Sequence, residues 1–254
     1  MRASVGLIGV GAFGEFMLPY LLPHCRIGAY DPVRDLEPLS ERWAVVAEPL
    51  EEVAGKDIVI LAMPVQRMAE VCRQIAPYLK PGALVLDVCS VKEEPIAAML
   101  ENLPAHVDIV GTHPLFGPQT GANGITGLRI ALCNVRGDRL DCVEAFLSKE
   151  LRLKTIVTTA EEHDRQLAFV QGLTHLMSKI VVEMDMPPLD HTTETFDIMM
   201  RMVESVRYDS EELFRAIENR NRFVGQTRRQ FFDAARTIEE RLAQPGPAGN
   251  EDSD

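Results

Sequence analysis

The sequence predicts an α/β protein: a doubly wound parallel sheet in the first part of the chain, followed by a helical second part. Two observations predict this class. Short β-branched runs alternate with helical patterns from residue 5 to about 135, and beyond about 160 the strand signals stop. Continuous apolar strands separated by helices are typical of a parallel sheet whose two faces are both covered.

Seven runs predict the strands in chain order. They are VGLIGV (5–10), RIGAY (26–30), DIVILAM (57–63), ALVLDV (83–88), HVDIVGT (106–112), RIALCNV (129–135) and LKTIVTT (153–159). Helical patterns follow at 160–184, roughly 192–206 and about 209–242. We therefore expect an α/β domain over residues 1–155, a helical domain over 156–243 and a tail over 244–254. The tail, QPGPAGNEDSD, has Pro, Gly and acidic residues without an apolar anchor, which predicts disorder.

Composition excludes several classes of function. A formal charge of -12 argues against nucleic acid as a partner, because phosphate binding needs a basic surface. No apolar run approaches the ~20 residues that cross a bilayer, so we expect no membrane role. The first residues show no cleavable signal, which favours a cytoplasmic protein. The five cysteines are scattered and never form C-x-x-C, so we expect neither disulfides nor a metal site.

A glycine-rich segment follows the first predicted strand. GVGAFG, from Gly9 through Gly11, Ala12 and Phe13 to Gly14, has the G-x-G-x-x-G spacing between a strand and a helix. In that context the glycines permit a tight turn, close approach of a pyrophosphate and close packing of helix on strand. The segment predicts a Rossmann-type dinucleotide site; a solvated glycine-rich turn is the alternative.

The residue after the second strand favours NAD. Asp31 can accept hydrogen bonds from the ribose hydroxyls and would repel a 2′-phosphate, whereas Arg34 leaves NADP as the less favoured cofactor. After the third strand, Met63 and Pro64 in AMPV are predicted to cover the bound cofactor.

Ser90 and His113 follow two neighbouring predicted strands. In a doubly wound sheet, ligands bind beyond the carboxyl ends of strands, so both are expected near the nicotinamide. A neutral imidazole at 113, held extended by Pro114, could accept a proton from a substrate hydroxyl while hydride leaves the same carbon. The alternatives are structural: Ser90 with Glu93 forms a capping box, and His113 fixes a loop.

The first long helical pattern carries a polar line. Asp164, Ala168, Gln171 and His175 are spaced by four, three and four residues, which places them on one helix face. We expect Gln171 and His175 to contact substrate; a satisfied core histidine is the alternative for His175. His163, in EEHD, is expected to interact only with its neighbouring acids.

These motifs together closely resemble the TyrA family, the prephenate and arogenate dehydrogenases of tyrosine biosynthesis. The resemblance rests on GVGAFG, LDVCSVKEEP, GTHPLFGPQTG and AEEHDRQLAFVQGLTH, and extends to about residue 225. Residues 195–214 look more like the plant-type branch. The family's catalytic histidine falls on His113, its partnering serine on Ser90 and its helical histidine on His175.

The resemblance implies an NAD-dependent oxidative decarboxylation in aromatic amino acid biosynthesis, carried out by a homodimer formed through the helical half. In that reaction His113 holds or deprotonates the C4 hydroxyl, and Ser90 orients His113 or the hydroxyl and touches the nicotinamide. Arogenate-specific relatives carry an acid at the position of Asn123, where a neutral amide would favour prephenate over the ammonium-bearing arogenate. Asn123 placed in a turn before Gly124 is the alternative.

The chain departs from the family at the arginine that binds the substrate carboxylate; Arg201 and Arg207 are the nearest candidates. Other functions stay open: arogenate or cyclohexadienyl dehydrogenase, a β-hydroxyacid-type dehydrogenase with Lys179 as its catalytic lysine, or a nucleotide-sensing protein without turnover.

Overall fold

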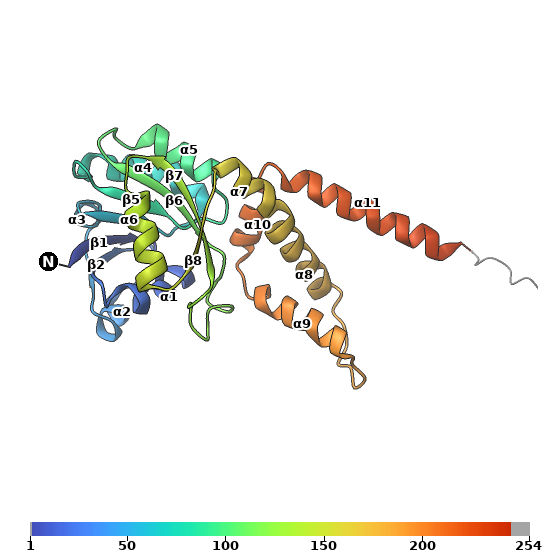
Figure 1. The fold of residues 1–254 in the computed structure, drawn as a ribbon. Coiled ribbons are helices and arrows are strands. Elements are labelled where there is room, and N and C mark those ends of the chain that lie inside the picture. Colours follow the sequence, from blue (N-terminus) through green and yellow to red (C-terminus); the bar gives the residue numbers. More distant parts are fainter. Residues whose placement is uncertain (1, 245–254) are drawn as a thin grey trace, which may run out of the picture.

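The computed structural model describes residues 2–244, in which an eight-stranded sheet with helices on both faces is followed by a group of helices (Figure 1). The strands are β1 (Ala3–Ile8), β2 (Cys25–Tyr30), β3 (Val45–Ala47), β4 (Ile58–Leu61), β5 (Leu84–Asp87), β6 (Asp108–Pro114), β7 (Arg129–Arg136) and β8 (Lys154–Val157). All seven predicted strands are present. Sequence patterns missed β3, because it is an edge strand of three residues with only Val45 buried.

The strand order is β3-β2-β1-β4-β5-β6-β7-β8, and the first six strands in that order run parallel. The predicted parallel sheet is confirmed for these six strands, whereas at the other end β7 runs antiparallel to β6 and β8 runs parallel to β7. Parallel neighbours need a long crossover, usually a helix. The segment 115–128 between β6 and β7 forms only turns, whereas α6 (Leu140–Ala145) connects β7 to β8.

Alternating side chains cover the two faces of the sheet. On one face, Val59 and Leu61 pack with α3 (Leu50–Ala54), α4 (Met68–Ile75) and α5 (Glu93–Asn102). On the other face, Ile60 packs with α1 (Ala12–Leu21) and α2 (Glu37–Arg42). Because these strands are parallel, the connections that follow their carboxyl ends all lie at one edge of the sheet. Ligands bind at that edge in such sheets.

The second half of the described chain is helical, as predicted. The single helix expected at 160–184 is α7 (Ala160–Leu167) and α8 (Thr174–Glu183) joined by a π-helical turn, Ala168–Leu173. At this turn Gly172 packs against Val224, where a Cβ atom would lie 3.1 Å from the valine side chain. Then come α9 (Glu194–Val206), α10 (Glu211–Arg220) and α11 (Val224–Ala243), which extends away from the other helices (Figure 1).

The strand β8 ends at Val157 and α7 begins at Ala160, while the exact division between residues 155 and 156 stays a prediction. The tail expected to be disordered lies outside the described residues, except for Gln244. Within residues 2–244, no helix has both the length and the apolar character needed to span a membrane.

Candidate active site

The glycine-rich turn lies between β1 and α1, and its geometry requires two of the three glycines. Gly9 has a φ of 92°, and a Cβ atom there would lie 2.6 Å from the carbonyl oxygen of Ala62. A Cβ atom on Gly14 would lie 2.5 Å from the carbonyl oxygen of Gly9. Gly11, by contrast, faces open space and begins α1 without a side-chain cap. The turn therefore fits a pyrophosphate, which would accept hydrogen bonds from the free backbone N–H groups.

Asp31 lies directly after β2 and is bonded to the same turn. Its Oδ2 accepts a hydrogen bond from Val10 N at 2.8 Å, and its Oδ1 accepts from Val33 N and Arg34 N, both at 2.9 Å. Burial alone would raise the pKa of Asp31, but these backbone hydrogen bonds and the Arg34 charge together hold it below its usual value. Asp31 is therefore a carboxylate, with about one of its four acceptor sites left for a ribose hydroxyl.

Arg34 crosses the glycine-rich turn. Its guanidinium donates to Val10 O and to Glu15 Oε2, each at 2.6 Å. These two contacts use two of the five N–H donors of the guanidinium.

The connection after β4 adjoins the segment after β5. Met63 is half-buried and Pro64 is exposed, and the thiol of Cys89 lies 3.9 Å from Met63 O. Met63 and Pro64 therefore lie beside the chain that carries Ser90, at the carboxyl edge of the sheet, where ligands bind in such folds.

Ser90 is half-buried, and the predicted capping box is absent. The helix α5 begins at Glu93 with Lys92 as its N-cap residue, and no side chain of its own segment caps it. Two donors at this helix end are bound by Asp164 of α7, whose Oδ1 accepts from Lys92 N at 2.8 Å and whose Oδ2 accepts from Glu93 N at 3.0 Å. Within residues 2–244, no hydrogen bond joins Ser90 to His113.

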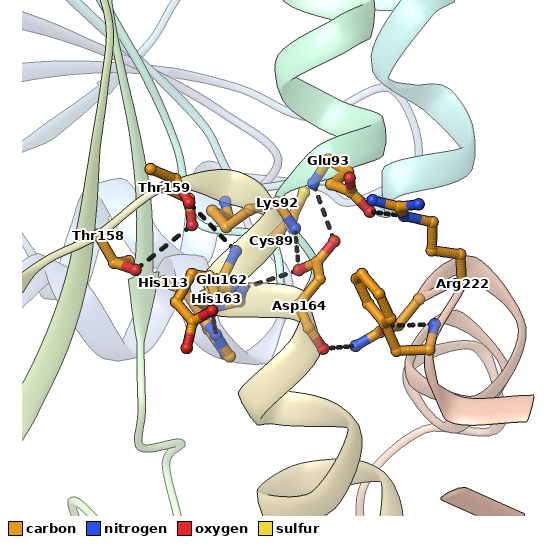
Figure 2. Close-up of polar contacts among 12 residues, drawn as sticks. Cys89, Lys92, Glu93, His113, Thr158, Thr159, Glu162, His163, Asp164 and Arg222 are labelled. Carbon is orange, nitrogen blue, oxygen red and sulfur yellow. Dashed lines mark hydrogen bonds and ion pairs between the residues drawn. The ribbon is translucent and has the colours of Figure 1, made fainter. Parts of the chain in front are cut away.

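His113 lies near the end of β6 and is only 3% exposed. Its Nδ1 lies 2.9 Å from Nε2 of His163, and His163 Nδ1 lies 2.8 Å from Oδ1 of Asp164 (Figure 2). The hydrogen-bond partner of His113 Nδ1 is thus His163 and not Ser90. The Nε2 of His113 forms no hydrogen bond with the described part of the chain.

The environment keeps His113 neutral. Burial, and after it the electrostatic influence of His163, Lys92 and His175, holds the pKa of His113 well below its usual value. This agrees with the uncharged imidazole that the sequence predicts at this position. A neutral ring with one free nitrogen can accept a proton near pH 7.

A buried ion pair lies behind this ring. The Nζ of Lys92 contacts Oδ2 of Asp87, at the end of β5, and donates to Thr112 O at 2.6 Å. Lys92 and Asp87 are both fully buried, and Asp87 also accepts from the backbone of Cys89 and Thr112. Together these contacts hold the ends of β5 and β6 in register.

The polar line of the first long helix is only partly directed toward His113. Asp164 and Ala168 are fully buried, and His175 is 9% exposed. His175 Nδ1 lies 2.9 Å from Gln171 O, and its Nε2 lies 3.0 Å from Oδ2 of Asp209. Both nitrogens therefore face acceptors, as in the alternative of a satisfied core histidine, and the half-buried Gln171 contributes its backbone.

The remaining candidates lie on the surface. Asn123 is exposed in the turn before Gly124, whose φ is 106°. Arg201 and Arg207 pair with Glu194 and Glu204 of α9, their own helix. Lys179, the lysine that a β-hydroxyacid-type reaction would need, has a half-exposed side chain near Glu211 at 3.5 Å, which disfavours that reaction.

A cavity of about 750 Å³ lies on the other side of β6 from this cluster. Thr112 and Pro114 line it, whereas His113, between them in the strand, points to the opposite face. The lining is mostly apolar and belongs to the sheet, α1 and α6. The histidine cluster is therefore separate from this cavity.

Comparisons with known proteins agree with the fold and with the motifs. Residues 42–149 match the model of the prephenate dehydrogenase nucleotide-binding domain. A probable arogenate/prephenate dehydrogenase of Methanocaldococcus jannaschii is 37% identical over 128 residues, which are 50% of this chain and 28% of that protein. The chloroplastic arogenate dehydrogenase 2 of Arabidopsis thaliana is 29% identical over 83% of this chain and 62% of that protein. The chain thus spans less than two thirds of these relatives.

Two solved structures have the same fold at low sequence identity. Prephenate dehydrogenase from Aquifex aeolicus, solved with hydroxyphenyl propionate and NAD+, superposes with a TM-score of 0.73 at 19% identity over 95% of this chain and 91% of that one. Synechocystis arogenate dehydrogenase superposes with a TM-score of 0.68 at 20% identity over 95% of this chain and 94% of that one.

Proposed function

Because this chain belongs to the prephenate and arogenate dehydrogenase family, we propose that it catalyses the NAD-dependent oxidative decarboxylation of prephenate to 4-hydroxyphenylpyruvate. The observation that carries the proposal is the neutral ring of His113, whose Nε2 has no partner in the described chain, at the sheet edge that also holds the glycine-rich turn. The arogenate dehydrogenases among the relatives make arogenate the second candidate substrate.

The cofactor site consists of the segment from Gly9 to Gly14, with Asp31 for the ribose and Met63, Pro64 and Ser90 beside the remainder of the molecule. NAD, when bound, accepts a hydride from substrate. The open space at Gly11 and the carboxylate of Asp31 both fit such a dinucleotide.

His113 has a double proton role in this reaction. Its Nε2 takes the proton of the C4 hydroxyl while the C4 hydrogen leaves as hydride, which creates a C4 carbonyl. When the C1 carboxylate departs as CO2, the electrons of that bond make the ring aromatic and place a negative charge on the C4 oxygen. His113 then returns its proton to this oxygen. Ser90, half-buried at the adjoining strand end, hydrogen-bonds the C4 hydroxyl in this proposal.

Substrate selection is assigned to the turn that contains Asn123 and to the first long helix of the helical half. Asn123 is neutral and does not repel prephenate. A carboxylate there would attract the ammonium of arogenate and repel the prephenate side-chain carboxylate. Gln171 and His175 border the substrate from the helical half.

We also propose that the enzyme is a cytoplasmic homodimer. The supporting observation is apolar exposure on α11, where Phe232, Ile238 and Leu242 are 40%, 55% and 80% exposed on a helix that extends away from the others (Figure 1). Surface of this kind is typical of an interface. Light scattering coupled to gel filtration would give the mass of a dimer, and a monomeric mass at micromolar concentration would contradict this assembly.

One assay tests the function. Absorbance at 340 nm is followed after prephenate or arogenate is added with NAD or NADP, and the expected order of kcat/KM places prephenate with NAD first. Absence of turnover in all four combinations would favour a nucleotide-sensing protein. Faster turnover of arogenate would assign the second candidate.

The variant Asn123→Asp tests the basis of selection. The ratio of kcat/KM for prephenate to that for arogenate should fall by at least tenfold, since the new carboxylate attracts the ammonium of arogenate and repels the side-chain carboxylate of prephenate. Asn134→Asp, a change of the same kind at an exposed position of β7, serves as the control and should leave the ratio unchanged. An unchanged ratio in Asn123→Asp would place Asn123 outside the substrate site.

A further inference from the structure

We propose that His163 and Asp164 are positioning residues, which fix the tautomer of His113 so that its Nε2 carries the free lone pair. The inference rests on the proposed function for its kinetic consequences. The tautomer itself can be measured without turnover.

The direction of each hydrogen bond follows from Asp164. Its two carboxylate oxygens already accept from two backbone N–H groups, those of Lys92 and Glu93. A carboxylate only accepts, so the Nδ1 of His163, 2.8 Å from Oδ1, is the protonated nitrogen of that ring. Neutral His163 therefore presents an unprotonated Nε2 to the neighbouring imidazole.

The unprotonated Nε2 of His163 in turn fixes the position of the hydrogen on His113. Its Nδ1 lies 2.9 Å from the unprotonated Nε2 of His163 and must donate the shared hydrogen. The neutral ring then has its lone pair on Nε2, which is the nitrogen without a partner in the described chain. In the other tautomer, His113 Nε2 would carry a hydrogen and could not accept the hydroxyl proton.

The fold keeps the carboxylate in place. Asp164 is fully buried and lies at the N-terminus of α5, where the helix dipole favours a negative charge. Its backbone carbonyl accepts from Asn221 Nδ2 at 2.6 Å, so the turn between α10 and α11 holds the first turns of α7. The exposed pair of Arg222 and Glu93, at 2.8 Å, closes over the same helix end (Figure 2).

The arrangement couples the two halves of the protein. His113 belongs to β6, whereas His163 and Asp164 belong to α7, and 50 residues separate the two imidazoles in sequence. The tautomer is therefore set only when the helical half is docked on the sheet. Once Nε2 has taken a proton, Nδ1–H of His113 still donates to His163, which Asp164 orients, as in other acid–base chains that use an orienting carboxylate.

Two substitutions of His163 test this role. His163→Leu removes the acceptor, and its kcat should fall about 100-fold or more, within the range of about 10²–10⁴ that a positioned base contributes. His163→Gln offers an amide oxygen to His113 Nδ1–H and should recover at least tenfold over His163→Leu. Both variants should bind NADH as the wild type does. His106→Leu, at the amino end of β6, is the matched control and should keep full turnover.

A spectroscopic readout separates positioning from folding. In protein labelled with ¹⁵N-histidine, which contains six histidines, long-range ¹H–¹⁵N spectra assign the protonated nitrogen of each ring. We expect His113 as the Nδ1–H tautomer in the wild type and in His163→Gln, and a shift toward Nε2–H in His163→Leu. A wild-type His113 in the Nε2–H form would overturn the proposal, as would folded His163→Leu with wild-type kcat. If the tautomer is Nδ1–H but no substrate is turned over, the proposed function fails and the positioning role stands.

Discussion

The glycine-rich turn and the histidine cluster lie at the same edge of the sheet but are held by different kinds of contact. The turn is held by hydrogen bonds between residues 21 and 24 positions apart, from Val10 to Asp31 and Arg34. The cluster around His113 is held by bonds that join residues 50 to 72 positions apart. The first site can form within β1, α1 and β2, whereas the second exists only when α7 is docked on β6 and α5.

This difference predicts where substitutions act. Changes near the glycine-rich turn should alter cofactor binding and leave the rest of the protein folded. Changes in the buried polar cluster should affect the stability of the docked halves together with catalysis, because its members also bind the ends of β5, β6 and α5.

The largest expected effect on stability is that of Lys92→Met. It leaves the fully buried Asp87 without its cation, which costs about 3–5 kcal/mol when one partner of a buried pair is removed. Urea denaturation measures the loss. Lys80→Met, which removes the partner of the exposed Asp57, should cost only about 0–1 kcal/mol. Equal losses in the two variants would contradict the structural role given to Lys92.

The double variant Asp87→Asn/Lys92→Met sharpens this test. If the cost of Lys92→Met comes from an isolated charge, neutralising Asp87 should recover part of the lost stability, because the amide can still accept from Cys89 N. Additive losses would instead indicate independent packing roles.

The next effect in size is that of Asp31→Ser on the cofactor. Loss of a charged acceptor for the ribose costs about 1.5–3 kcal/mol, so kcat/KM for NAD should fall about tenfold to a hundredfold while that for NADP falls less. Asp35→Ser, an exposed acid four residues on, is the control. A constant ratio of NAD to NADP in Asp31→Ser would remove Asp31 from the cofactor site.

The smallest expected effect is the pH dependence set by His113. Because its folded pKa is lowered well below the usual value of about 6.5, the acid limb of kcat/KM should lie below that value. The unfolded chain binds this proton more readily, so the contribution of His113 to stability is complete above about pH 6.5 and is lost as pH falls toward the folded pKa. Thermal melts from pH 8 to 5 measure the loss of stability. An acid limb of kcat/KM above pH 6.5 would contradict the lowered pKa of His113.

The sequence predicts the local features of the fold and site well. The glycine spacing, the position of Asp31 and seven of the eight strands follow from patterns within a few residues. The strand β7 was predicted, but its antiparallel direction was not, because alternating strands and helices elsewhere suggested a crossover that the turns of 115–128 do not supply.

The features that could not be predicted depend on contacts between distant segments. The sequence around His163 predicts its contact with the neighbouring Asp164. Nothing in that sequence predicts its second contact, with His113. Lys92 in VKEEP has the pattern of an exposed helix start, yet it is fully buried. The capping box failed for the same reason, because Asp164 from another helix binds the donors that Ser90 was expected to bind.

The most direct test of the account is the turnover of His113→Asn with prephenate and NAD, measured beside its affinity for NADH. We expect kcat to fall by a factor of about 10²–10⁴ while NADH binds as in the wild type, because only the proton acceptor is removed. A folded variant that keeps kcat within about tenfold of the wild type would contradict the assignment of His113 as the base.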